Sequence, residues 1–73
     1  MKIKTNKQDT FYKLLYSAGI SSIQSRYVAY KLETKLNSID TIVKIGNSFI
    51  VNNLYRITPL SFAIPPTNID LIR

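Results

Sequence analysis

The fold is decided by FYKLLYSAGISSIQSRYVAYKLETKL, which occupies residues 11–36. The first apolar residues of this stretch recur at the i, i+3, i+4, i+7 spacing of one helix face, at Phe11, Leu14, Leu15 and Ala18. This spacing predicts a helix from about residue 6 to residue 18. Thr5 and Gln8 precede the periodic residues in the pattern of a capping box, which strengthens the predicted start.

A short joint is expected directly after this helix. Gly19 suits the left-handed position that ends a helix, and Ile20 is the apolar residue that packs back on the last turn. Ser21 and Gln24 form a second capping-box pattern. The sequence therefore predicts a joint of two or three residues and a second helix over about residues 22–37.

The second helix has two different sides. One side is expected to face the first helix and a sheet, and it carries Ser25, Val28, Ala29, Leu32 and Leu36. The other side carries Ile23, Tyr27 and Tyr30 near Arg26 and Lys31. This second side is either an aromatic and basic contact surface or a second contact with the core. Two alternatives also remain for Tyr12 and Tyr16, which either widen the buried face or form a stacking pair beside Lys13.

Residues 41–58 read as a β-meander. Gly46 and Asn47 suit a two-residue type II′ hairpin turn, and Asn52 and Asn53 suit a second tight turn. Pairing outward from these turns sets Val43 opposite Ile50, Ile50 opposite Tyr55 and Ser48 opposite Ile57. The predicted core face is then Val43, Ile45, Ile50, Tyr55 and Ile57. The other face mixes apolar and basic residues and is either half-covered or an interaction face, with Ile42, Lys44, Phe49, Val51, Leu54 and Arg56.

These elements predict a single small α+β domain over residues 1–73, with two N-terminal helices, a three-stranded antiparallel meander and an extended C-terminal segment. Residues 1–5 are expected as a flexible basic arm or a short edge strand. Residues 59–73 are expected as an apolar tail, extended around Pro65 and Pro66, that packs over the helices or on a second subunit.

The composition excludes several classes of function. The chain has no cysteine and no histidine, which removes disulfides, thiolate metal sites and the commonest general base at neutral pH. Its four acidic residues are scattered along the chain. We therefore expect no enzyme activity, no metal and no cofactor. No apolar run reaches the roughly 18–20 residues of a membrane span, and the N-terminus lacks a signal-peptide pattern, so we expect a cytoplasmic protein without membrane contact.

Charge points to an anionic partner. Ten lysines and arginines against four aspartates and glutamates give a net charge of +6, without any polybasic run. We therefore predict a small nucleic-acid-binding protein, a DNA-binding regulator or accessory factor, with DNA favoured over RNA. The expected phosphate contacts are Lys13, Arg26, Lys31, Lys35, Lys44 and Arg56, and the expected base or sugar contacts are Gln24, Tyr27 and Tyr30.

The order of helix, glycine joint, helix and hairpin resembles part of a winged helix-turn-helix domain over residues 10–52. Residues 18–32, AGISSIQSRYVAYKL, resemble its turn and recognition helix. The resemblance implies a second helix in the DNA major groove and a hairpin that touches the backbone through Lys44 or Asn47. The implied groove-facing residues are Ser22, Gln24, Ser25, Arg26 and Ala29. The chain departs from this family in two ways, because eight residues are too few for the usual preceding helix and Ser25 replaces a residue that is usually apolar.

A second resemblance is local. The stretch VKIGNSFIV, residues 43–51, is similar to a strand of swapped-hairpin antitoxins and transition-state regulators, which bind DNA as dimers, although their following Arg-Ile-Pro segment is replaced here. The alternative function is a protein–protein interaction module, such as a small inhibitor, an adaptor or a subunit of a larger assembly, that uses Phe49, Tyr55 and the C-terminal tail. A chain this short buries only about 60% of its unfolded surface on folding, so a homodimer is a further alternative.

Overall fold

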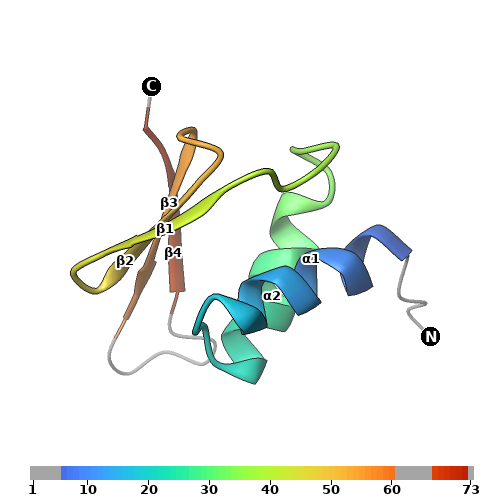
Figure 1. The fold of residues 1–73 in the computed structure, drawn as a ribbon, viewed down its shortest axis with the longest axis horizontal. Coiled ribbons are helices and arrows are strands. Elements are labelled where there is room, and N and C mark those ends of the chain that lie inside the picture. Colours follow the sequence, from blue (N-terminus) through green and yellow to red (C-terminus); the bar gives the residue numbers. More distant parts are fainter. Residues whose placement is uncertain (1–5, 61–66, 73) are drawn as a thin grey trace.

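Two helices lie against one face of a four-stranded antiparallel sheet (Figure 1). The computed structural model describes residues 6–60 and 67–72. The α+β class is therefore confirmed. The predicted arm at residues 1–5, the Thr5 cap and the double proline at residues 65–66 lie outside the described residues. In chain order the elements are α1 (Asn6–Ser17), α2 (Ser22–Leu32), β1 (Ile42–Ile45), β2 (Ser48–Val51), β3 (Tyr55–Pro59) and β4 (Thr67–Leu71).

The joint between the helices forms as the sequence predicts. The Gly19 N–H donates to the Tyr16 carbonyl at 3.1 Å, and the Ile20 N–H donates to the Leu15 carbonyl at 3.2 Å. These are the two bonds of a Schellman motif, which ends α1 while Gly19 adopts a φ of +110°. Ile20 is buried in the core, so the joint is held by packing as well as by hydrogen bonds.

Helix α2 begins at the expected cap and ends earlier than expected. The Ser21 hydroxyl oxygen accepts a 3.3 Å bond from the Gln24 N–H, which caps the helix. The prediction that the helix continues to Asn37 is wrong, because regular helix stops at Leu32. The chain then tightens into a turn in which the Lys35 N–H donates to the Leu32 carbonyl at 2.9 Å.

The N-terminal end of α1 covers this turn. The Lys7 ammonium donates to the Glu33 carbonyl at 3.1 Å and to the Leu36 carbonyl at 3.3 Å. The Gln8 side-chain amide donates to the Glu33 carboxylate at 2.6 Å. Carbonyls at a helix C-terminus lack partners within the helix, so Lys7 stabilises the earlier end of α2.

The sheet has the order β1-β2-β3-β4, and every neighbouring pair is antiparallel. The first hairpin is confirmed, since Gly46 has a φ of +60° and Val43 pairs with Ile50. The prediction of three strands and an extended tail over residues 59–73 is wrong in part. Residues 67–71 form the fourth strand, β4, along the edge of β3.

The register between β2 and β3 differs by one residue from the prediction. Val51 pairs with Tyr55, whereas the sequence predicts Ile50 opposite Tyr55. Asn52 and Asn53 both take a positive φ, as expected for that turn. Leu54 is the additional residue in the loop, and its N–H donates to the Val51 carbonyl at 2.9 Å. A shift of one residue exchanges the two faces of a strand.

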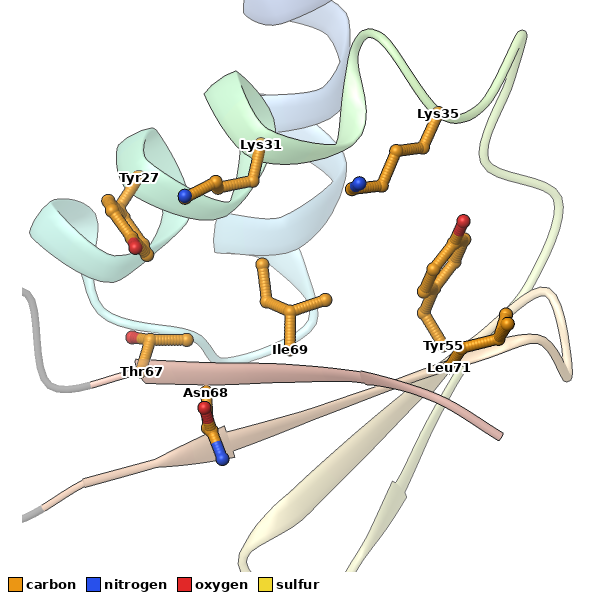
Figure 2. A pocket seen from close by; sticks show the side chains of 8 residues that line it. All are labelled: Tyr27, Lys31, Lys35, Tyr55, Thr67, Asn68, Ile69 and Leu71. Atoms are coloured by element: carbon orange, nitrogen blue, oxygen red, sulfur yellow. The ribbon is translucent and has the colours of Figure 1, made fainter. Parts of the chain in front are cut away.

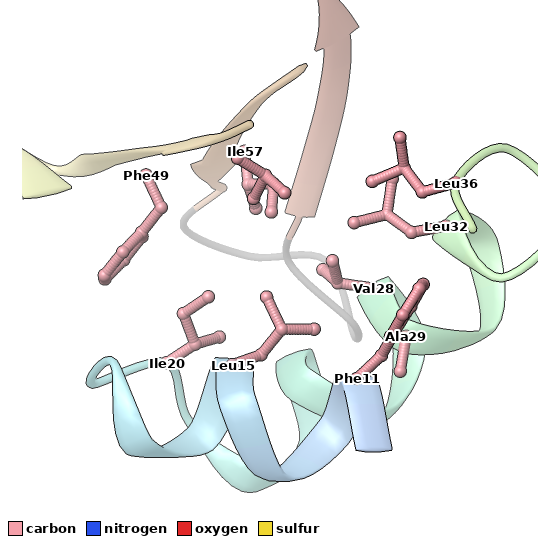
Figure 3. Close-up of a cluster of buried hydrophobic side chains, with 10 residues drawn as sticks. Phe11, Leu15, Ile20, Val28, Ala29, Leu32, Leu36, Phe49 and Ile57 are labelled. Carbon is pink, nitrogen blue, oxygen red and sulfur yellow. The ribbon is translucent and has the colours of Figure 1, made fainter. Parts of the chain in front are cut away.

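The predicted core face of the sheet is also wrong. Phe49 and Val51 are buried, whereas Val43 and Ile45 are 47% and 62% exposed. Ile57 stays buried because it pairs with Phe49 on the side that faces the helices. Figure 3 shows side chains from both layers meeting in one cluster. The buried apolar residues are Phe11, Leu15, Ile20, Val28, Ala29, Leu32, Leu36, Phe49, Val51 and Ile57.

One side chain holds the connection between α2 and β1. The Asn52 side-chain oxygen accepts bonds from the N–H groups of Asp40 at 2.7 Å and Thr41 at 3.1 Å. The Asn52 side-chain nitrogen donates to the Ser38 carbonyl at 2.9 Å. The turn between β2 and β3 is therefore tied to the segment that crosses from the helices to the sheet.

Candidate functional site

Three residues of α2 and its C-terminal turn line a groove beside the edge of the sheet. Tyr27 and Lys31 are four residues apart, which places them on one side of α2, and Lys35 follows in the turn after the helix. Figure 2 shows this row of side chains facing strand β4. We name the space between them the α2–β4 groove, and its volume is about 460 Å³. The opposite wall consists of Tyr55, Thr67, Asn68, Ile69 and Leu71.

The α2–β4 groove is basic. Two of its lining residues are lysines and none is acidic. The Lys31 ammonium nitrogen lies 5.4 Å from the centre of the Tyr27 ring, within the range of a cation–π contact. The groove thus places positive charge next to an aromatic face, and this combination suits phosphate groups and nucleobases.

A hydroxyl on the β4 wall has no hydrogen-bond partner in the described part of the chain. Thr67 is 9% exposed, and its Oγ1 is buried without a hydrogen bond among the residues that the structure describes. The neighbouring Ile69 is partly buried and packs against the core. A buried hydroxyl that is left unpaired raises the free energy of the folded chain.

Both arginines of the predicted contact set lie against acidic side chains. A guanidinium nitrogen of Arg26 lies 3.2 Å from an Asp9 carboxylate oxygen, and the guanidinium carbon is 3.8 Å from the centre of the Tyr12 ring. A guanidinium nitrogen of Arg56 lies 3.9 Å from an Asp70 carboxylate oxygen across β3 and β4. Such exposed pairs are weak, but each places a negative charge beside the arginine.

The tyrosines of α1 connect the two helices. The rings of Tyr12 and Tyr16 stack on each other, with 5.8 Å between centres and 13° between planes. The Tyr12 hydroxyl lies 3.0 Å from the Ser22 hydroxyl at the start of α2. Lys13 is exposed on the same helix and forms no salt bridge within the described residues. Tyr12 therefore contributes to the contact between α1 and α2, whereas Tyr16 is 56% exposed.

Two further predicted residues lie at a different hollow. Gln24 and Lys44, together with Asn47, line a space of about 420 Å³ between the helix joint and the β1–β2 hairpin. The Lys44 ammonium nitrogen lies 5.8 Å from the centre of the Phe49 ring. The Gln24 side chain accepts a 3.2 Å bond from the Ser21 hydroxyl and so belongs to the helix cap. The predicted residues are thus divided between separate places on the molecule.

Helix α2 has an exposed outer side and a buried inner side. Ile23 and Tyr30 are exposed on the outer side, and Tyr30 lies beside the two lysines of the groove. Ser25 and Ala29, which the winged-helix resemblance places in a DNA groove, are buried at the helix contact, so that implication is wrong for these two. Phe49 was expected at a partner surface and is also buried.

The β4 wall is missing from the sequence-based prediction, which treats residues 67–71 as part of a tail. A signal was present, because Thr67, Ile69 and Leu71 alternate with Asn68 and Asp70 at the period of a strand. The alternation predicts a strand but not its position, because only pairing with β3 brings β4 beside α2. Tyr55, predicted for a protein partner, is part of the same wall.

Within the described residues, no group of three or more His, Cys, Asp or Glu side chains is placed to hold a metal ion. No helix in residues 6–60 or 67–72 has the length and apolarity needed to cross a membrane. No protein-family model matches the chain, and comparison with curated proteins and with solved structures finds no significant match. The assignment of function therefore rests on the geometry and charge of the α2–β4 groove.

Proposed function

We propose that this chain is a small, non-enzymatic nucleic-acid-binding protein of the cytoplasm that contacts phosphates through the α2–β4 groove. One observation carries the proposal: Lys31 and Lys35 line the groove together, and none of its other lining residues is acidic. Lysine is a strongly hydrated point charge that binds phosphate oxygens without demanding a fixed angle. The net charge of +6 adds a long-range attraction for a polyanion.

The expected loss of affinity can be calculated from the salt dependence of phosphate binding. Each neutralised phosphate contributes about −0.9 to the slope of log affinity against log salt for a duplex, and about −0.7 for a single strand. Removing the charges of Lys31 and Lys35 should therefore flatten that slope by roughly 1.4 to 1.8. At 0.1 M salt the same change should weaken binding by about 25- to 60-fold.

The test is a fluorescence-anisotropy titration with labelled duplex DNA, single-stranded DNA and duplex RNA at two salt concentrations. The double variant Lys31→Gln, Lys35→Gln is compared with Lys13→Gln, Lys44→Gln, which removes the same charge outside the groove. The groove variant should lose much more affinity than its control. Equal losses would show that the groove is not the contact surface. Absence of any binding by the unaltered chain at low salt would overturn the proposed function.

A protein-interaction module is the second candidate, and the outer face of the sheet favours it. Val43 and Ile45 are exposed on β1, and Ile50 of β2 lies opposite Val43 on the same face. The helices occupy the other face of the sheet (Figure 1). Exposed apolar residues that gather on one face are typical of a contact with another protein. Such a contact responds weakly to salt, so the titrations above also separate the two candidates.

A further inference from the structure

The α2–β4 groove holds two aromatic rings at a distance from each other. In Figure 2, Tyr27 lies at the end near Thr67, Tyr55 lies at the end near Lys35, and Ile69 lies between them. We infer that this groove binds single-stranded nucleic acid, with an unstacked base against a tyrosine ring and the flanking phosphates on the lysines. The inference rests on the proposed function and names the form of polymer that is bound.

The shape of the groove favours a single strand over a duplex. Its volume of about 460 Å³ lies in the range of roughly 300–1,000 Å³ in which small molecules bind. A duplex keeps the faces of its bases stacked inside and presents only phosphates, sugars and base edges. The tyrosine rings and Ile69 would find no apolar face to contact on such a surface. Bases of a single strand are free to leave the stack and lie on an aromatic side chain.

On the same wall, backbone groups of β4 have no partner strand among the residues that the structure describes. The Ile72 N–H donates to the Leu54 carbonyl at 2.9 Å, and antiparallel pairing alternates, so Thr67, Ile69 and Leu71 direct their backbone groups away from β3. Since β4 is the last strand of the sheet, no described strand pairs with these groups. They can serve the edge of a base or a sugar hydroxyl.

The same edge, which no described strand covers, would also accept an extended peptide as a fifth strand. Two features favour nucleic acid as the occupant. Tyr27 and Tyr55 offer ring faces that every base can stack on, whereas strand addition needs no aromatic ring. The lysines are matched by a phosphate at every nucleotide, whereas a peptide would need acidic residues at the right positions.

The first experiment uses the unaltered full chain and three labelled oligonucleotides of the same length. These are a mixed-sequence single strand, its duplex and an abasic strand that keeps the phosphates but has no bases. The single strand should bind about 10-fold or more tightly than the abasic strand, because stacking acts only on bases, and it should also bind more tightly than the duplex. Equal affinity for the single strand and the abasic strand would overturn the inference, and so would tighter binding of the duplex. In both of these cases the proposed function would stand. Absence of binding to any of the three oligonucleotides at low salt would contradict both the proposed function and the inference.

A second experiment places the contact in the groove. Tyr55→Leu is compared with Tyr16→Leu, a change at an exposed tyrosine that lies outside the groove. Tyr55→Leu should weaken binding of the base-bearing strand by about 10-fold and leave binding of the abasic strand unchanged. Should that variant unfold in a circular-dichroism check, Tyr27→Leu takes its place. Equal losses of affinity for the groove variant and for Tyr16→Leu would contradict the placement of the base in the groove. In a competition assay, an acidic peptide that displaces the oligonucleotide and binds more tightly would also contradict it.

Discussion

Replacing Asn52 with glycine should destabilise the fold, although the exchange looks harmless at a turn. Asn52 has a φ of +55°, a backbone conformation that glycine adopts without strain. The exchange therefore keeps the turn and removes only the side chain. That side chain makes three hydrogen bonds, to the backbone of Ser38, Asp40 and Thr41.

The magnitude follows from these bonds. A hydrogen bond contributes about 0.5–1.5 kcal/mol net, and water replaces part of the loss because these groups are near the surface. Three bonds therefore suggest a loss of about 2 kcal/mol in the free energy of unfolding. For a domain of this size, that loss lowers the melting temperature by roughly 8–16 °C.

Asn53→Gly is the matched control. Asn53 has a φ of +53°, nearly the same as Asn52, and it makes no side-chain hydrogen bond within the described residues. Both exchanges change the unfolded chain in the same way, so their difference reports the side-chain bonds alone. Urea unfolding followed by tyrosine fluorescence measures both variants. Equal midpoints for the two variants would refute the view that Asn52 holds the connection between α2 and β1.

Two further predictions concern single positions. Gly19→Ala should lower the free energy of unfolding by about 1–2 kcal/mol through backbone strain alone, because no atom lies within 4 Å of the added carbon. An unchanged melting temperature would contradict the Schellman joint. Thr67→Val should raise the free energy of unfolding of the unbound chain by about 1 kcal/mol, because it removes an unpaired buried hydroxyl from a strand. A less stable variant would mean that this hydroxyl already has a partner.

The helical half of the molecule was predictable because its signals are local. The glycine joint, the Ser21 cap and the apolar spacing of α1 each involve residues within one or two turns. The end of α2 was placed five residues too late, and the carbonyls beyond its observed end are bonded by Lys7 of α1. Lys7 lies 26 residues before the carbonyl of Glu33, and no local pattern reports such a contact.

The candidate site was predictable only in part. Tyr27 and Lys31 share one side of α2, and that follows from their spacing, whereas Lys35 joins them from the turn after the helix. The pairing of Arg26 with Asp9 does not follow from the sequence, because Asp9 comes from another helix. Likewise, the wall that makes a groove of these residues belongs to β4, and strand pairing alone brings it there.

The sequence by itself determined the two helices, the joint at Gly19, the hairpin at Gly46 and the excess of positive charge. Each depends on backbone preferences of a few neighbouring residues or on composition. Only the tertiary structure decided which face of the sheet is buried, where residues 67–71 pair and which lysines share a groove. The physical reason is that Leu54 adds one residue to the β2–β3 loop, and a shift of one residue exchanges the faces of β3 relative to β2. Ile57 therefore shares a face with Phe49 rather than with Ile50, and that apolar face meets the helices.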